Sequence, residues 1–126
     1  MSTEKRPPRV LLVDDSDDTR ELYREILSDR YDIVEAEDGR QALAEARERT
    51  PDVIVMDLSL PDMRGEDAIA ELRRPDVPRI PVVVLSGHPE PRENRAGWDA
   101  YLVKPCLPNA LADCLDRLLD ARASAT

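Results

Sequence analysis

Residues 10–15 read VLLVDD, four consecutive apolar residues followed by two aspartates. Further apolar runs of strand length lie at residues 53–56, 80–85 and 100–103, and a weaker, partly alternating run lies at 31–36. Continuous apolar strands are typical of a parallel sheet whose two faces are both covered by helices. The alternating run at 31–36 predicts a strand nearer an edge of that sheet.

The segments between these runs carry apolar residues at helical spacing. The first helix, at residues 20–29, is predicted to use one face for burial, with Leu22, Tyr23, Ile26 and Leu27 on it. Three more helices are expected, at residues 39–49, after the turn at 61–65, and from Pro108 onward.

Alternation of strands and helices predicts the fold class, a single doubly wound α/β domain with a five-stranded, mostly parallel sheet. We place the domain at residues 9–120, with a flexible tail at residues 1–8 and a second tail at 121–126. The 126 residues suffice for one such domain, and we expect no second catalytic or output domain within them.

The composition argues against several classes of function. Eighteen basic residues stand against 27 acidic ones, a formal net charge of −9, so the domain repels nucleic-acid phosphates and anionic lipid surfaces. No apolar run approaches the roughly 20 residues that span a bilayer, and the polar N-terminus lacks signal-peptide character. We expect a cytoplasmic protein with neither nucleic acid nor a membrane as a direct partner.

Chemically active side chains follow the strands at their carboxyl ends, where such sheets bind ligands. Asp14 and Asp15 follow the first strand and Asp57 the third, while Ser86 and Lys104 follow the fourth and fifth. Clustered carboxylates need a cation, and a set of oxygen ligands suits Mg²⁺. A metal, a hydroxyl and an ammonium around a nucleophilic carboxylate are what phosphoryl transfer requires.

Four segments carry a resemblance to a known family: VLLVDD at 10–15, VMDLSLPDMRG at 55–65, VLSG at 84–87 and YLVKP at 101–105. They resemble the receiver domain of two-component response regulators over about residues 9–120. The resemblance implies a flavodoxin-like fold with strand order 2-1-3-4-5, an order known from a chemotaxis receiver of this family.

The resemblance also implies the phosphoacceptor and the metal ligands. Asp57 is expected to accept a phosphoryl group from a sensor histidine kinase or a histidine phosphotransfer protein. Asp57 is expected to be a metal ligand as well as the nucleophile. Asp15 is expected to bind Mg²⁺ directly and Asp14 through water, and the backbone carbonyl of Ser59 completes the protein ligands. The Ser59 side chain is a candidate modulator of the phosphoryl group.

Further positions take their expected roles from the same likeness. Ser86 and Lys104 would bind phosphoryl oxygens, and Pro105, following a cis bond, would orient the lysine. Tyr101 matches an aromatic position that turns inward on activation; the alternative is a half-buried strand tyrosine. His88 matches a position above the phosphoryl group that modulates its hydrolysis; the alternative is an exposed loop histidine.

The sequence departs from the family between Ser86 and Lys104, where it is about one helical turn, roughly four residues, too short. Residues 87–97 are polar and hold two prolines, so we expect the family's fourth helix to be truncated or absent. Trp98 is predicted to cover the core. Because this helix and the fifth strand form the family's main output face, the downstream partner stays open.

The expected function is that of a single-domain response regulator, which signals through protein contacts or acts in a phosphorelay. A receiver-like interaction module without phosphorylation is one alternative. A haloacid-dehalogenase-like phosphatase is another, because residues 15–19 fit its D-x-D-x-T pattern, with Asp15 as nucleophile and Asp17 as acid. Against this, Arg20 replaces an apolar residue and Asp57 stays unexplained.

Overall fold

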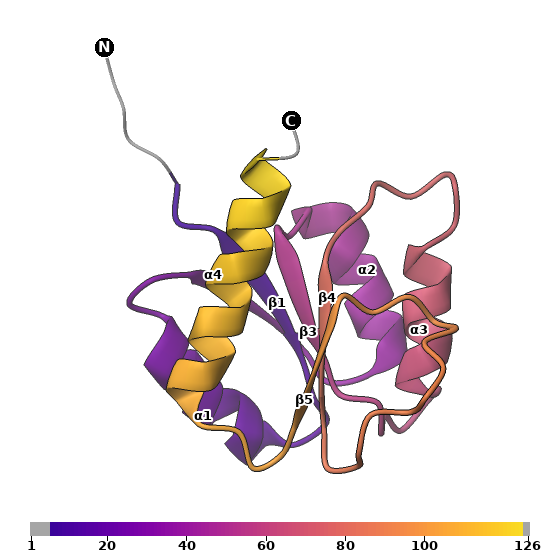
Figure 1. The fold of residues 1–126 in the computed structure, drawn as a ribbon, viewed down its shortest axis with the longest axis horizontal. Helices are drawn as coiled ribbons and strands as arrows, with labels where there is room; N and C mark the ends of the chain where they lie inside the picture. The colour runs from indigo at the N-terminus through magenta and orange to yellow at the C-terminus, as the bar shows by residue number, and fades with distance from the viewer. Residues whose placement is uncertain (1–5, 125–126) are drawn as a thin grey trace.

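The computed structural model describes residues 6–124, and within them five strands alternate with helices (Figure 1). The strands are β1 (Arg9–Val13), β2 (Asp32–Ala36), β3 (Val53–Met56), β4 (Val82–Ser86) and β5 (Ala100–Val103). The helices of this described part are α1 (Asp17–Leu27), α2 (Gly39–Arg49), α3 (Gly65–Leu72) and α4 (Pro108–Ser124).

The sheet is parallel throughout and has the order β2-β1-β3-β4-β5, which confirms the predicted fold class and topology. Helices α1 and α4 cover one face, and α2 and α3 cover the other (Figure 1). The weaker strand β2 lies at an edge, as its alternating sequence predicts. Because all strands run the same way, their carboxyl ends meet at one edge of the sheet.

Strand β1 shows how the core is divided between the two faces. Leu11 and Val13 belong to the apolar cluster under α2 and α3, whereas Val10 and Leu12 belong to the cluster under α1 and α4. All four side chains are buried. Successive strand residues point to opposite faces, so a strand covered on both sides must be apolar at every position.

Helix α1 differs from the prediction in its start and in its buried face. It begins at Asp17 instead of residue 20, because the Ser16 hydroxyl caps it by accepting a hydrogen bond from the Thr19 N–H at 3.2 Å. The residues turned inward are Arg20, Tyr23 and Leu27. Two residues of the predicted face, Tyr23 and Leu27, are buried as expected. The other two, Leu22 and Ile26, point away from the core and are 52% and 38% exposed.

The chain between β4 and β5 forms no helix, so the predicted loss of the family's fourth helix is confirmed for this described segment. Helix α4 is the helix that follows β5. Trp98 is 6% exposed and lies in the core cluster under α2 and α3, as predicted. Asn94 holds the turn before it, because its side-chain oxygen accepts from the N–H groups of Gly97 (2.9 Å) and Trp98 (3.0 Å).

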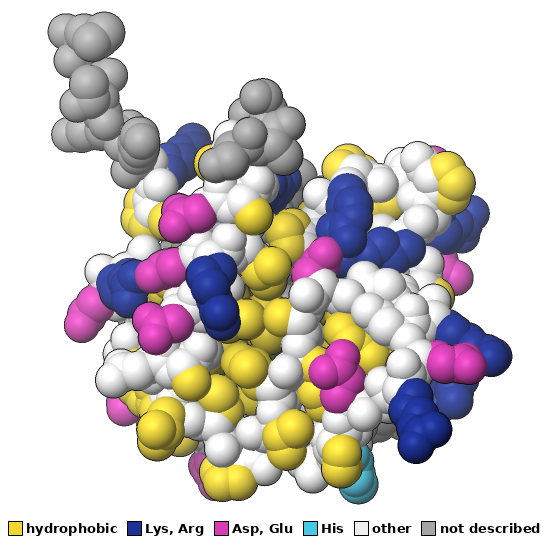
Figure 2. All heavy atoms as spheres, in the orientation of Figure 1, with side chains coloured by type: hydrophobic (Ala, Val, Ile, Leu, Met, Phe, Trp, Pro, Cys, Tyr) yellow, Lys and Arg dark blue, Asp and Glu magenta, His cyan; other side chains and the backbone are white. Residues whose placement is uncertain are grey.

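Apolar side chains are exposed on β5 and in the chain that follows it. Figure 2 shows hydrophobic side chains gathered between α4 and β5. Val103 and Leu107 are among the exposed large hydrophobic residues. In the described part of the chain, no helix is both long and apolar enough to cross a membrane.

The ends of the domain depart slightly from the predicted boundaries. Helix α4 continues through residues 121–124, which the sequence assigns to the C-terminal tail. Residues 6–8 precede β1 without regular structure. Residues 1–5 of the predicted N-terminal tail and residues 125–126 lie outside the described part.

Candidate functional site

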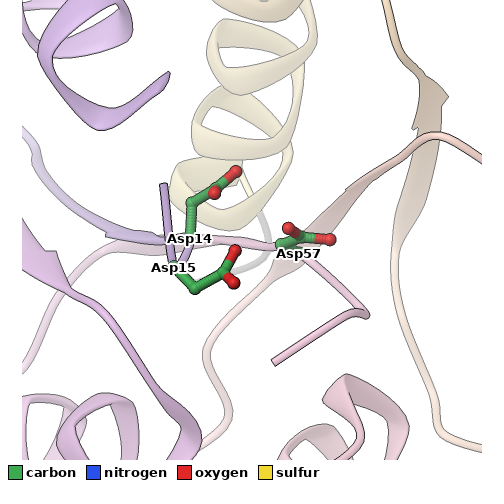
Figure 3. Close-up of side chains that lie close together, drawn as sticks. All are labelled: Asp14, Asp15 and Asp57. Atoms are coloured by element: carbon green, nitrogen blue, oxygen red, sulfur yellow. The ribbon is translucent and has the colours of Figure 1, made fainter. Parts of the chain in front are cut away.

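Three carboxylates meet at the carboxyl edge of the sheet. Asp14 and Asp15 follow β1, and Asp57 follows β3, the neighbouring strand (Figure 3). One carboxylate oxygen from each lies within 4.8 Å of the other two. Asp14 and Asp57 are buried, whereas Asp15 is exposed. The structure thus brings together the three aspartates that the sequence predicts for the site.

Lys104 bridges two of these carboxylates. Its Nζ donates to Asp14 Oδ2 at 2.9 Å and lies 3.6 Å from Asp57 Oδ2. Burial lowers the pKa of Lys104, but the hydrogen bond to Asp14 and the charges of Asp14 and Asp57 outweigh it and raise the pKa above 10.5. Lys104 therefore stays charged in the site and offsets part of the repulsion between the aspartates.

Asp57 has a carboxylate that burial makes harder to ionise. Burial raises its pKa above the ordinary 3.8, and the charges of Asp14 and Asp15 add to this. The N–H of Ser59, which donates to Oδ1 at 3.1 Å, and the nearby Lys104 act in the opposite direction. The net result is a raised pKa, so the ionised form of Asp57 is electrostatically unfavourable in the folded chain.

The loop after β3 is folded back so that Ser59 stays beside the site. Gly65 donates its N–H to the Leu58 carbonyl at 2.9 Å, and a Cβ on Gly65 would lie 2.7 Å from the Asp57 carbonyl oxygen. Glycine is therefore required at this close approach. Ser59 and Arg64 form an isolated antiparallel bridge within the loop.

Asp62 anchors the same loop and was not predicted from the sequence. Its carboxylate accepts the N–H groups of Gly39 (2.7 Å) and Arg40 (2.9 Å) at the start of α2. These bonds lower the pKa of Asp62. Nothing near Asp62 in the sequence signals this contact, because its partners lie more than twenty positions away.

Ser86 ends β4, the strand next to β3, and is buried. Its Oγ accepts the N–H of His88 at 3.1 Å, which leaves the hydroxyl hydrogen to donate to an incoming oxygen. His88 itself is exposed. The backbone carbonyl of Ser86 accepts the N–H of Lys104 at 2.7 Å, and the Lys104–Pro105 peptide bond is cis.

Tyr101 lies half-buried on β5, and its hydroxyl is tied to the segment that replaces the missing helix. It donates to the backbone carbonyls of His88 (2.9 Å) and Pro89 (3.3 Å). Its ring centroid is 5.5 Å from that of Trp98. The structure thus places the predicted switch residue against the 87–99 segment, and its switching role stays a prediction.

The donor set fits a divalent magnesium ion. All candidate side-chain ligands are carboxylate oxygens, and two of the three are buried. Mg²⁺ prefers oxygen ligands and keeps several waters, which suits a cluster that is open at Asp15. One ammonium cannot neutralise three carboxylates, so a cation would relieve the remaining repulsion.

The phosphatase pattern at residues 15–19 is not supported by the geometry. Asp17, its expected acid, lies in the first turn of α1 and forms an ion pair with Arg20. Asp57 instead shares the cluster with Asp14 and Asp15.

Comparison with known proteins identifies the family of the chain. The response regulator receiver domain family matches residues 10–116, so the chain belongs to that family. The chain is 35% identical to the chemotaxis protein CheY of Halobacterium salinarum, over 90% of this chain and 98% of that protein. It is 36% identical to the transcriptional regulatory protein PrrA of Mycobacterium tuberculosis, with 98% of this chain aligned. The chain spans about half, 55%, of the length of PrrA.

Solved structures give the same result for the fold. The signal receiver domain of a putative Luxo repressor protein from Vibrio parahaemolyticus superimposes with a TM-score of 0.84 at 33% identity, covering 93% of this chain and 92% of that one. A CheY-like receiver domain protein from Methanospirillum hungatei superimposes with a TM-score of 0.85 at 26% identity, covering 94% and 98%.

Proposed function

We propose that this receiver domain accepts a phosphoryl group on Asp57 from a phosphohistidine donor, with Mg²⁺ held by Asp14, Asp15, Asp57 and the Ser59 carbonyl. The observation that carries the proposal is the position of Asp57. It is a buried carboxylate grouped with Asp14 and Asp15, with the Lys104 ammonium 3.6 Å away. Such an arrangement serves a group that gains negative charge during a reaction.

The transfer is a simple displacement at phosphorus. An oxygen of ionised Asp57 forms a bond to the phosphorus while the P–N bond of phosphohistidine breaks, and the imidazole keeps that electron pair and takes up a proton. Hydrolysis of the acyl phosphate by water would release inorganic phosphate and restore Asp57. The chain thus assists its own phosphorylation and dephosphorylation, without turning over a separate substrate as an enzyme does.

Other residues of the site bind and orient the phosphoryl group. Lys104 would move from its contacts with Asp14 and Asp57 to a phosphoryl oxygen, and Ser86 would donate its free hydroxyl hydrogen to another. Mg²⁺, when bound, withdraws charge from a phosphoryl oxygen and so stabilises the transition state. Asp14, Asp15 and Asp57 would hold the ion, because one carboxylate oxygen of each lies within 4.8 Å of the other two.

The donor would be a sensor histidine kinase or a histidine phosphotransfer protein in the cytoplasm. The output would be a phosphorylation-dependent contact with a downstream protein, or onward transfer in a phosphorelay. Relatives of this chain include a chemotaxis protein and a transcriptional regulatory protein, which supports an output through a downstream protein. His88, Ser59 and Tyr101 would modulate the lifetime or the readout of the phosphoryl group.

The test is intact-mass spectrometry after incubation with acetyl phosphate and Mg²⁺. Wild-type protein should gain the mass of one phosphoryl group, and Asp57→Asn should gain none. Asp15→Asn serves as a second comparison and should load slowly, because it retains the acceptor but lacks a metal ligand.

Incorporation into Asp57→Asn would contradict the proposal and point to another nucleophile. If wild-type protein gains no mass, transfer from a ³²P-labelled histidine kinase decides the question. Absence of label there as well would favour the interaction module that works without phosphorylation.

A further inference from the structure

Arg20 is a buried arginine in α1, next to the aspartate cluster. It is 9% exposed. One nitrogen, Nη1, donates to the backbone carbonyl of Asp14 at 2.5 Å, and Nε donates to Glu35 Oε1 at 3.2 Å. A third nitrogen donates to Asp17. None of the roles described above uses this side chain.

The bond to the Asp14 carbonyl fixes the backbone that carries two carboxylates of the site. The carbonyl of Asp14 and the N–H of Asp15 belong to one planar peptide group, so holding that oxygen restrains both residues. The peptide group on the other side is held as well, since the Asp14 N–H donates to the Ala36 carbonyl of β2 at 3.1 Å. Adjacent like charges favour a more open arrangement, which these bonds oppose.

The partners of Arg20 also fix the direction of its guanidinium. Glu35 on β2 and Asp17 on α1 bind two of its nitrogens, and a planar guanidinium held at two points has little freedom at the third. Glu35 is held in turn by Arg24, which donates to Oε2 at 2.7 Å. The chain of contacts therefore runs from β2 and α1 to the Asp14–Asp15 peptide group.

We infer that Arg20 is a positioning residue of the magnesium site, which raises Mg²⁺ affinity by holding the Asp14–Asp15 peptide group in place. The inference rests on the proposed function, because it assumes that Mg²⁺ binds at these aspartates. Partners behind the metal ligands often change metal affinity by 10- to 100-fold when mutated, and we expect about tenfold here.

Isothermal titration calorimetry with Mg²⁺ tests the inference without any phosphodonor. Arg20→Gln should raise the dissociation constant for Mg²⁺ about tenfold. Arg24→Gln is the matched control: it removes the other arginine from Glu35 but does not touch Asp14, so its affinity should stay within about twofold of wild type. Arg20→Lys, which keeps the charge but loses the planar fork, should also bind several-fold more weakly.

A second measurement separates positioning from general structural damage. In phosphorylation by acetyl phosphate, Arg20→Gln should need about tenfold more Mg²⁺ for half-maximal rate, while the rate at saturating Mg²⁺ stays close to wild type. A variant that is merely partly unfolded would lose rate at every Mg²⁺ concentration. Circular dichroism checks folding, and Arg20→Lys supplies the comparison if Arg20→Gln does not fold.

The outcomes are distinguishable. Wild-type affinity for Mg²⁺ in a folded Arg20→Gln or Arg20→Lys variant would overturn the inference, as would an equal loss in Arg24→Gln. If the wild-type protein does not bind Mg²⁺, or if Asp15→Asn binds it as tightly as wild type, the proposed metal site itself is wrong. Arg20 then has no metal site to position.

Discussion

The aspartate cluster at the carboxyl edge of the sheet and residues 87–99, which run from the end of β4 to the start of β5, are held together by opposite means. The cluster brings like charges together, and burial raises the pKa of Asp57. The 87–99 segment lacks the helix usual in the family and is held instead by an apolar anchor and polar bonds to distant residues. One region is electrostatically unfavourable, and the other is held by contacts that favour the folded state.

Arg73 is the centre of the polar bonds to this segment. From the end of α3 it donates to the carbonyls of Gly97 (3.0 Å) and Ile80 (2.8 Å), and to the carboxylate of Asp99 (2.9 Å). Asp99 also accepts the N–H of Val82 at 2.7 Å. Substitutions in the segment should therefore lower the stability of the fold, whereas neutralising an aspartate of the cluster should raise it.

The largest effect is expected for Trp98→Ala. Removing this buried side chain from a helix-free segment should lower the free energy of unfolding by about 3–5 kcal/mol. Urea unfolding followed by circular dichroism measures it. Trp98→Phe is the control, because it keeps a ring but loses the Nε1 bond to Glu90 at 3.1 Å, and should cost about 1 kcal/mol. A loss below 1 kcal/mol in Trp98→Ala would show that the segment is not anchored by the core.

Arg73→Met should have the next largest effect. It leaves the carbonyls of Ile80 and Gly97 without these donors, and we expect a loss of about 2–3 kcal/mol in urea unfolding. Arg79→Met is the matched control, because Arg79 pairs with the same Asp99 but its side chain is 59% exposed. This variant should lose less than about 1 kcal/mol. Equal losses in both variants would mean that the ion pair to Asp99, and not the carbonyl bonds, holds the segment.

The smallest effect has the opposite sign. The pKa of Asp57 is raised in the folded chain, so the folded state holds that proton more tightly than the unfolded state. The stability that protonation contributes is complete below the ordinary pKa of 3.8 and is lost as pH rises through the folded-state value. Asp57→Asn should therefore be more stable than wild type at pH 7, and the gain should vanish in acid.

Thermal unfolding between pH 3 and 8 in the absence of Mg²⁺ measures this gain. Asp15→Asn, at an exposed position, should gain less. Added Mg²⁺ should stabilise wild-type protein more than Asp57→Asn, because a cation bound to the folded state adds to its stability. A destabilised Asp57→Asn at pH 7 would contradict the account of the cluster as electrostatically unfavourable.

The sequence predicts the cluster better than the segment for a physical reason. Asp14, Asp57 and Ser86 each stand at the end of a buried strand, and parallel pairing alone brings such ends together. Arg73 and Asp62 act through partners far away in the sequence, which no local pattern reveals. The missing helix was predictable from length and composition, but the bonds that replace it were not.

The buried face of helix α1 was predicted wrongly for a different reason. Leu22 and Ile26 are apolar, and a face containing them with Tyr23 and Leu27 is the most hydrophobic choice. The packed helix turns Arg20 inward instead, where Glu35 and Asp17 satisfy its charge. A buried charged residue paired from other elements is not visible in a hydrophobic pattern. Only the helical spacing of residues 20, 23 and 27 indicated in the sequence that these three side chains share a face.

The most direct test of the central claim is to locate the phosphoryl group. Protein loaded with acetyl phosphate and Mg²⁺ is reduced with sodium borohydride, which converts an acyl phosphate to the alcohol and so turns a phosphorylated aspartate into homoserine. Peptide mass spectrometry should then find homoserine at position 57, with Asp14 and Asp15 unchanged. Homoserine at position 15, or at neither position in protein that has gained a phosphoryl mass, would contradict the account.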